Sequence, residues 1–455
     1  MTTVNKKKNK LLYAIDQSIA RVLAIVLNLI VRFTPNQWKQ KKEYLAEHQQ
    51  TLHNVVGLTG LNALGGVLIL LTQVKLANVL GASIYGMFSY YVAIGEVGCM
   101  IVRYGRHKTM TRDLIQRPEK TPFLIVNTFL LSALNLVLFT ATVLFFHKLL
   151  DAELSWAFFF LVVSPCLISM DFQPVYEALR LMSWHSIYNL LQKALFLSSI
   201  WFVIYIMGTP TLISIGIVMF VSWVLVLMVQ FQEIMGTFSE KISSFISISN
   251  IQSLYRDNFV IALSCMFGVA FGPLIRMILN QYADSRSVGI YSAGMQIFLI
   301  SQFVLHQVGR VGNPMMAEVG KENSSLQKRV LFVKRYIVTM LAATVPFALP
   351  MIVIPQIITN CFFIEEYSSL AEYLPILAIY LVIFGIGVVF TQFLISVRAD
   401  KSYFAIYVSA SIATVATSYL LIPSWGVMGA MISLCVPNGV ACIAYALASL
   451  KYLRK

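Results

Sequence analysis

Apolar residues dominate the chain in runs of 18 to 25 positions that recur from residue 52 almost to the end. A helix of about 20 apolar residues crosses the roughly 30 Å hydrocarbon core of a bilayer. The pattern predicts an all-α integral membrane protein with twelve transmembrane helices. We expect these spans at 53–77, 84–105, 121–147, 157–179, 186–207, 210–232, 257–280, 287–310, 330–356, 372–396, 402–421 and 426–449.

The composition agrees with this pattern. Of the 455 residues, 58% are hydrophobic and 12% are charged, whereas about 25% are charged in a soluble domain. The net charge of +14 would suggest a nucleic-acid partner in a soluble protein, but 29 of the 34 Lys and Arg residues lie on one side of the predicted spans and three on the other. The positive-inside rule therefore places both termini in the cytoplasm, and no nucleic-acid partner is expected.

Residues 1–50 precede the first span and form a separate segment. Within them, an apolar stretch at 11–33 carries one polar stripe, which predicts an interfacial amphipathic helix on the cytoplasmic leaflet. Docking of a partner protein is the alternative role for this segment. The stripe consists of Gln17, Arg21, Asn28 and Arg32.

Catalytic signatures are missing from the sequence. No connection between spans exceeds about 25 residues, so no catalytic domain outside the membrane is expected. The pair Gly320-Lys321 lacks the flanking residues of a phosphate-binding loop. The six cysteines are scattered without metal-binding spacing. We therefore expect a transporter rather than an enzyme, with no ATP hydrolysis, disulfide, metal or cofactor.

A short motif occurs twice in the chain, 203 residues apart. At this offset Gly86 aligns with Gly289, and Ser89 aligns with Ser292. The offset is nearly half of the membrane domain, which predicts two parallel six-helix repeats related by a pseudo-two-fold axis. We expect one lobe at 51–250 and another at 251–455, around a central cleft.

The run from Leu76 to Gly81, followed by Tyr85-Gly86, resembles the "LA..LG...YG" signature of O-antigen and capsular polysaccharide (Wzx-like) flippases. The segments 288–292, 421–423 and 426–430 add to this resemblance. These flippases belong to a superfamily that includes lipid II flippases and multidrug and toxin extrusion transporters.

The resemblance implies that the protein carries an undecaprenyl-diphosphate-linked oligosaccharide from the cytoplasmic to the outer leaflet of the bacterial inner membrane. Alternating access is the implied mechanism. Membrane lipids and polysaccharide polymerase or assembly proteins are the implied partners. Two alternatives remain open: an ion-coupled multidrug exporter, and a membrane-embedded polysaccharide polymerase or glycosyltransferase.

Cations within or near the spans are the first candidates for binding a diphosphate, because an unpaired charge in hydrocarbon is costly. The offset aligns Arg103 with His306 and His107 with Arg310, which predicts convergence near the cytoplasmic side. Arg276 lies where positive charge is otherwise scarce. The candidate set for a cationic lumen is Arg103, His306, Arg310, Arg276, Lys75 and Lys193. Their alternative roles are marking the membrane boundary and snorkelling to the interface.

Uncharged polar residues and carboxylates complete the candidate site. Ser89, Gln296 and Gln302 are predicted to line the lumen. Glu96 and Asp171 are the carboxylates well within the spans, which makes them candidates for proton or cation coupling. A lumen with net positive charge would favour an anionic lipid-linked substrate over a cationic drug.

Overall fold

The apolar segments form long helices that pack side by side, and the described residues contain no strand. The structure is a computed structural model that describes residues 49–149, 155–179, 181–236, 245–319 and 325–453. Nine of the described helices are long and apolar enough to cross a bilayer, or ten if one bent pair counts as a span. The chain is therefore a multi-pass membrane protein. The predicted interfacial helix at 11–33 lies outside the described residues.

The first half of the chain contains the longest helix, α3, which has 55 residues and leaves helical geometry at Gly81. An unbroken helix of this length would extend about 80 Å, well beyond the bilayer core. The two parts of α3 correspond to the first two predicted spans. The elements of this half are α3 (Gln49–Arg103), α4 (Arg106–Gln116), η2 (Pro118–Lys120), α5 (Thr121–Leu149), α6 (Trp156–Leu167), η3 (Ile168–Met170), α7 (Gln173–Ala178), α8 (Met182–Met207) and α9 (Leu212–Met235).

The second half ends in a helix of similar length, α16, which has 54 residues and a non-helical residue at Gly426. It covers the last two predicted spans. The elements of this half are α10 (Ile248–Met266), η5 (Phe267–Phe271), α11 (Pro273–Tyr282), α12 (Ser285–Val319), α13 (Leu326–Val353), α14 (Pro355–Phe362), η6 (Glu365–Tyr367), α15 (Leu370–Ser396) and α16 (Asp400–Leu453).

The predicted total of twelve spans is not confirmed. Two of the nine spanning helices each cover two predicted spans, and the predicted span at 257–280 is divided among α10, η5 and α11. The bent pair consists of Ile248–Phe259 and Ile261–Phe271, which meet at 56°. Prediction from apolar length locates the segments, but it does not reveal where a helix bends.

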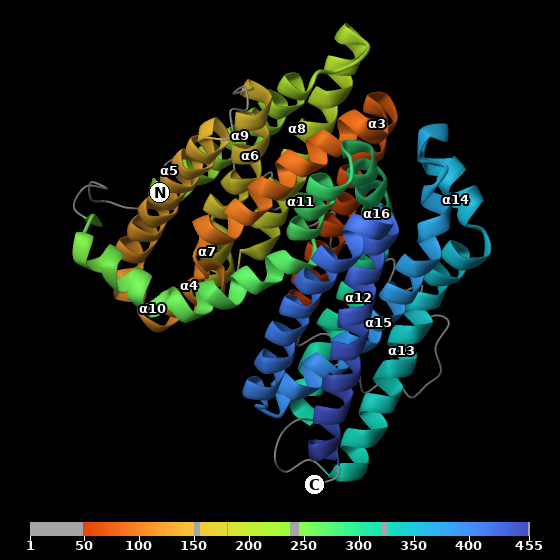
Figure 1. Ribbon diagram of the computed structural model, residues 1–455. Helices are drawn as coiled ribbons and strands as arrows, with labels where there is room; N and C mark the ends of the chain where they lie inside the picture. Colours follow the sequence, from red (N-terminus) through yellow and green to blue (C-terminus); the bar gives the residue numbers. More distant parts are fainter. Residues whose placement is uncertain (1–48, 150–154, 180, 237–244, 320–324, 454–455) are drawn as a thin grey trace.

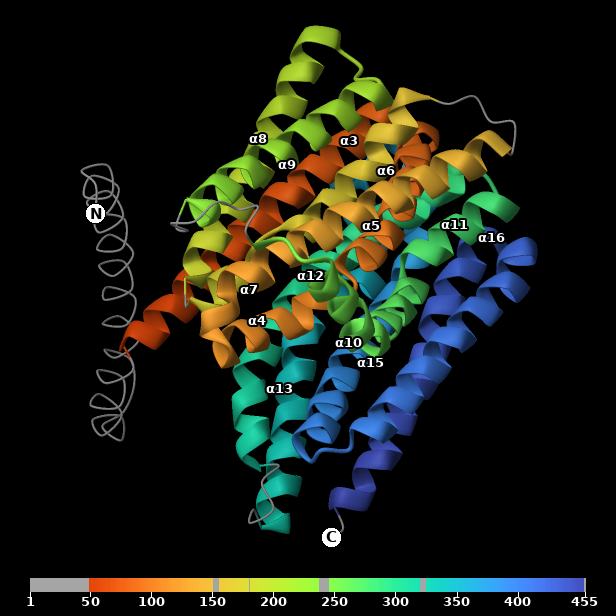
Figure 2. The same ribbon diagram turned by 90° about the vertical axis from the view of Figure 1, so that its left-hand side faces the viewer.

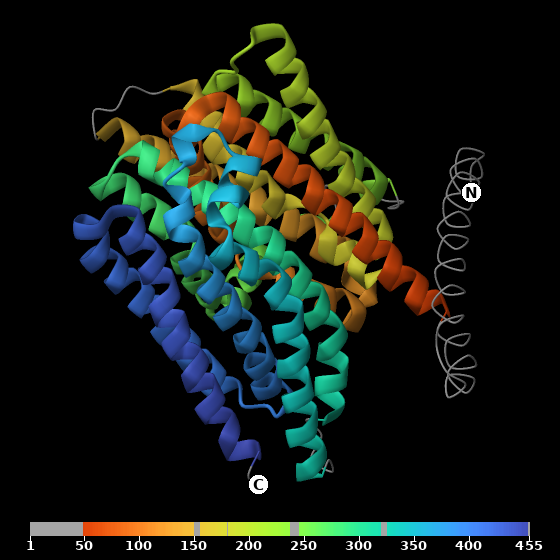
Figure 3. The ribbon, with the colours of Figure 1, turned by 90° about the vertical axis from the view of Figure 1, so that its right-hand side faces the viewer.

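The helices form two groups that meet along α3 and α12 (Figures 1 and 3). On one side, α8 packs on α3 and α9, and α6 also packs on both (Figure 2). On the other side, α15 packs on α12, α13 and α16. The helix α10 contacts α3, α4 and α5, whereas α11 contacts both α3 and α16. The division into lobes at residue 250 stays a prediction.

The duplicated motif lies where α3 and α12 cross. A β-carbon at Gly86 would overlap the carbonyl oxygen of Ser285, and one at Gly289 would overlap that of Ala82. These contacts are reciprocal, because Ser285 and Gly289 lie 203 residues after Ala82 and Gly86. Small residues four positions apart allow helix backbones to approach closely in membranes. The predicted repeat therefore lies at a close, reciprocal contact between the two halves.

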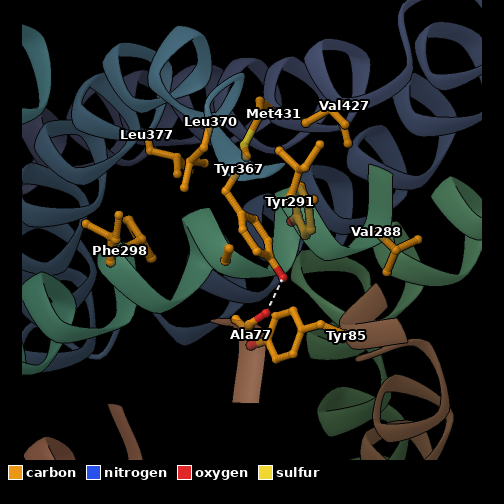
Figure 4. Close-up of a cluster of buried hydrophobic side chains, with 14 of the residues drawn as sticks. Ala77, Tyr85, Val288, Tyr291, Phe298, Tyr367, Leu370, Leu377, Val427 and Met431 are labelled. Atoms are coloured by element: carbon orange, nitrogen blue, oxygen red, sulfur yellow. Dashed lines mark hydrogen bonds between the residues drawn. The ribbon is translucent and has the colours of Figure 1, made fainter. Parts of the chain in front are cut away.

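Buried aromatic residues surround this crossing (Figure 4). Tyr85, Tyr291 and Tyr367 are among the largest fully buried side chains. They come from α3, α12 and η6, so the core joins both groups of helices. The hydroxyl group of Tyr367 donates a hydrogen bond to the carbonyl oxygen of Ala77, 3.1 Å away (Figure 4).

Candidate functional site

We describe two cavities of the structure, and the larger of them has a volume of about 1090 Å³. Its walls come from both parts of α3, from the region between α6 and α7, from α8 and α9, and from α12. Its polar and titratable lining residues are Gln73, Glu96, Cys99, Gln173, Glu177, His185, Ser186, Asn189, Lys193 and Gln296. The cavity thus reaches the contact between the two halves of the chain, and it combines apolar walls with a few charged groups.

One face of α8 lines the cavity with four residues. His185, Asn189 and Lys193 are spaced four residues apart and Ser186 lies beside them, so these side chains share one helical face. Lys193 is half-buried. Within the part of the chain that the structure describes, no carboxylate lies within 4.0 Å of its ammonium group and no hydrogen bond to it is found. It is therefore available to bind an anion in the cavity.

An ion pair joins α3 to α11 beside the cavity. The guanidinium group of Arg276 contacts the carboxylate of Glu96, and it also donates a hydrogen bond to the backbone oxygen of Ser89 at 3.4 Å. The Glu96 side chain is 38% exposed and lines the cavity, whereas that of Arg276 is 15% exposed. Glu96 therefore neutralises the cation expected to bind the diphosphate.

A second polar network lies near α7. The Nε2 atom of His185 lies 3.1 Å from the carboxylate of Asp171. The carboxylate of Glu177 accepts hydrogen bonds from the Gln173 amide at 2.7 Å and from the Thr111 hydroxyl at 3.0 Å. Asp171 thus orients a ring that lines the cavity, and Glu177 brings a second carboxylate to its lining.

Arg103, His306 and Lys75 are not among the described residues that line this cavity. Arg103 donates a hydrogen bond to the backbone oxygen of Ile168 at 3.3 Å, and the exposed ring of His306 packs edge-on against Phe384. The Lys75 ammonium lies 4.7 Å from the ring centre of Trp201. The side chain of Arg310 is outside those described. Neither Arg103 nor His306 is among the described residues that line the larger cavity, and their convergence near the cytoplasmic side stays a prediction.

The smaller cavity, of about 310 Å³, lies among the helices of the second half. Gln302 lines it, so the two glutamines predicted to share one lumen, Gln296 and Gln302, face different cavities. Its other polar lining residues are Tyr380, Thr391, Tyr403, Tyr407, Asn438, Cys442 and Tyr445.

Hydrogen bonds join the break in α3 to the segment after α14, and we call this contact the latch. The Asn78 amide donates to the oxygen of Phe362 at 2.8 Å and accepts from the N–H group of Ile364 at 3.1 Å. The N–H group of Ala82 donates to the Glu366 carboxylate at 2.8 Å. The latch lies at the end of the molecule away from the C-terminus (Figure 1).

Sequence comparison identifies the family. A family model described as "Polysaccharide biosynthesis protein" matches residues 51–320, which is more than half of the chain. The chain belongs to this family. The resemblance predicted from the segment between Leu76 and Gly86 is thereby confirmed. No curated protein sequence matches the chain.

Solved structures show the fold of this polysaccharide biosynthesis protein. Lipid II flippase MurJ in an inward closed conformation has a TM-score of 0.68 and 12% identity, covering 86% of this chain and 87% of that chain. An inward-facing multidrug resistance MATE transporter of the MOP superfamily has a TM-score of 0.65 and 14% identity, with coverages of 87% and 94%. A MOP superfamily transporter from Pyrococcus furiosus Vc1 has a TM-score of 0.57 and 14% identity, with coverages of 89% and 96%. The fold is that of MOP superfamily transporters.

The charged residues that line the larger cavity do not give it the net positive charge that the sequence predicted. Its described lining contains Glu96 and Glu177 against Lys193 and the titratable His185. Sequence analysis missed His185, although its spacing from Lys193 on α8 was a usable signal. The latch joins residues 284 or more positions apart, so no local pattern could have revealed it.

Proposed function

We propose that the protein is a flippase that carries an undecaprenyl-diphosphate-linked oligosaccharide from the cytoplasmic to the outer leaflet of the inner membrane. The observation that carries this proposal is Lys193, a cation without a carboxylate partner among the described residues, in the 1090 Å³ cavity of a polysaccharide biosynthesis protein. The carrier lipid and the direction come from the family resemblance. Cytoplasmic termini come from the distribution of Lys and Arg.

The cavity suits a glycan attached to a diphosphate. Its volume is at the upper limit of small-molecule pockets, which hold about 300–1,000 Å³. A diphosphate loses its hydration when it enters the membrane, so it requires a compensating cation. The Lys193 ammonium supplies one, while Gln73, Asn189 and Gln296 offer hydrogen bonds to sugar hydroxyl groups.

Alternating access assigns a role to the latch. In this conformation the latch joins the two halves at one end, while the cavity extends along α8 towards α7. We infer that transport requires the latch to open so that the cavity can face the other leaflet. The two bonds of Asn78 are worth about 0.5–1.5 kcal/mol each and the bond to the Glu366 carboxylate about 1.5–3 kcal/mol, so separation is accessible on the timescale of transport.

An ion-coupled multidrug exporter is the second candidate. The carboxylate of Glu177 in the cavity lining favours it, because a cationic drug would bind to a carboxylate. Under this alternative, Glu177→Gln would abolish drug efflux, and Lys193→Gln would not impair it. Under the flippase proposal, Lys193→Gln impairs glycan export. Neither the wild-type protein nor the variants then show drug efflux.

Substitution of the two intramembrane lysines tests the proposal. We expect Lys193→Gln to abolish surface glycan and Lys193→Arg to retain part of it, because the positive charge remains. Lys75→Gln is the matched comparison, since Lys75 contacts Trp201 outside the cavity lining, and it should reduce export less. Surface glycan is measured at equal protein abundance. Export at the wild-type level in Lys193→Gln would contradict the proposal.

A further inference from the structure

The smaller cavity occupies a position in the second half that corresponds to the larger cavity in the first half. Gln302 lines the smaller cavity, and the residue 203 positions earlier, Cys99, lines the larger one. Phe271 lines the smaller cavity, and the neighbours of its counterpart, Val67 and Ile69, line the larger one. The larger cavity is lined mainly by the first half with one wall from α12, the smaller cavity lies in the second half, and the two differ in size and chemistry.

Tyrosines form much of the smaller cavity. Tyr403 stacks on Tyr407 with ring centres 6.0 Å apart and on Tyr445 with ring centres 5.9 Å apart. Tyr380 stacks on Phe298, with ring centres 4.8 Å apart. These contacts hold the rings in place, so the cavity is a preformed aromatic pocket.

Polar atoms in this cavity lack partners. Among the described residues, none of the four lining tyrosine hydroxyl groups has a hydrogen bond, and neither does the Gln302 carboxamide. The Asn438 amide group donates to the Leu434 oxygen at 2.7 Å, which leaves its own oxygen free to accept. None of these atoms is among the fully enclosed polar atoms that lack a partner, so they are open to the cavity, where a ligand or water can pair with them. This concentration of available donors and acceptors is typical of a ligand site.

Charge defines the ligand class. None of the described residues that line the smaller cavity is Asp, Glu, Lys, Arg or His, so this lining offers no ion pair to a phosphate, a cationic drug or a metal ion. An apolar lipid chain would leave its hydroxyl and carboxamide groups unpaired. An uncharged sugar ring suits both the aromatic rings and the polar groups of this cavity. Its C–H faces pack on aromatic rings, and its hydroxyl groups exchange hydrogen bonds with phenol and amide groups.

We propose that the smaller cavity binds one uncharged sugar residue. Its volume of about 310 Å³ lies at the lower limit of ligand pockets, near 300 Å³, which suits a single ring rather than an oligosaccharide. The identification of this sugar as part of the transported glycan rests on the proposed flippase function. The larger cavity then holds the diphosphate and the sugars attached to it, and the smaller, uncharged cavity binds one further sugar residue.

Saturation-transfer NMR on the full chain in lipid nanodiscs tests the site. The probes are methyl glucoside, methyl galactoside and N-acetylglucosamine, with glucuronic acid as the charged counterpart. We expect at least one neutral probe to bind and glucuronic acid to bind more weakly. Tyr403→Leu should lower the affinity at least about ten-fold, since it removes the ring at the centre of both stacks. Gln302→Leu, which leaves the aromatic packing intact, should also weaken binding.

A tyrosine outside the cavity provides the matched control. Tyr419 lies on the same helix as Tyr403 and is 49% exposed, so Tyr419→Leu should leave probe binding unchanged. Equal losses in Tyr403→Leu and Tyr419→Leu, no binding of any neutral probe, or displacement of the sugar by farnesol would overturn the proposal. Lys193→Gln should retain sugar binding even where glycan export is lost, so the failure of the site and the failure of the flippase function give different results.

Discussion

The two halves of the molecule contribute equivalent glycines, Gly86 and Gly289, to one crossing. They differ in whether a charged residue lies near that crossing. In the first half, the part of α3 that follows Gly81 carries Glu96, which pairs with Arg276 and lines the larger cavity. In the second half, the equivalent residue on α12 is Leu299. The reciprocal approach of Gly86 and Gly289 is common to both. The repeat therefore conserves its backbone packing within one chain while each half has its own cavity chemistry.

The helix starts in the two halves also differ. The N–H group of Ala82 donates to Glu366, 284 residues away. At the equivalent start of α12, Asp284 occupies the position of Gly81 and accepts from the N–H group of Ser287 at 2.7 Å. The start of α12 is thus capped by the neighbouring Asp284. The helix that begins after Gly81 is capped by Glu366, from a distant part of the chain. The distant cap is the one that can act as a latch.

The largest expected effect comes from the shared contact. Gly86→Leu places a side chain against the Ser285 carbonyl, and overpacking costs about 1–3 kcal/mol or more. We expect loss of folded protein, measured by size-exclusion chromatography in detergent. Gly387→Ala is the control, because a β-carbon there meets no atom within 4 Å. Normal folding of Gly86→Leu would contradict the assigned crossing.

Locking the latch should be the next largest effect. Cysteines are placed at positions 78 and 364, where the Asn78 side-chain oxygen accepts a hydrogen bond from the Ile364 backbone N–H group at 3.1 Å. The exposed Cys361 is replaced by Ser in this background. We expect oxidation to stop glycan export and reduction to restore it, because the latch must open during transport. Each single cysteine variant serves as a control. Full export by the cross-linked protein would show that the latch does not move.

A smaller effect is expected from the asymmetric ion pair. Arg276→Ala leaves Glu96 without its partner, which should destabilise the protein by roughly 1–3 kcal/mol and reduce export. In the double variant Glu96→Leu, Arg276→Leu, position 96 carries the residue found at the equivalent position 299. No unpaired charge remains from the pair, so thermal stability should be regained. Export is then measured in the double variant, and recovery there would mean that the pair acts only on structure. Wild-type stability of Arg276→Ala would exclude the pair as a stabilising contact.

The smallest effect concerns the local cap. Hydrogen bonds from Ser287 hold the pKa of Asp284 below its ordinary value of 3.8, so the ionised carboxylate is the stabilising form. Its contribution is present above that pH and is lost as the pH falls through the lowered pKa. We expect Asp284→Ala to cost about 1 kcal/mol at neutral pH and to flatten the acidic limb of the melting profile. An unchanged profile would contradict this role.

Much of the fold was available from the sequence. Apolar length predicted membrane helices in the right places, and the aligned pairs Gly86 with Gly289 and Ser89 with Ser292 marked a repeat that lies at the central crossing. The motif from Leu76 to Gly86 identified the family. These features are local, because the need to satisfy backbone hydrogen bonds in lipid makes a long apolar segment helical whatever its neighbours are.

Only the tertiary structure decided which polar groups meet. Lys75 and Lys193 were equivalent candidates by sequence, yet one contacts Trp201 and the other lines a cavity. Arg276 was predicted from its position alone, and only the structure shows that it pairs with Glu96, 180 residues away. A charged residue in a span is stabilised by a carboxylate, a cavity or the membrane surface, and the choice depends on how its helix is rotated against neighbours that are distant in sequence. That rotation is a property of the packed protein and is not encoded within the span itself.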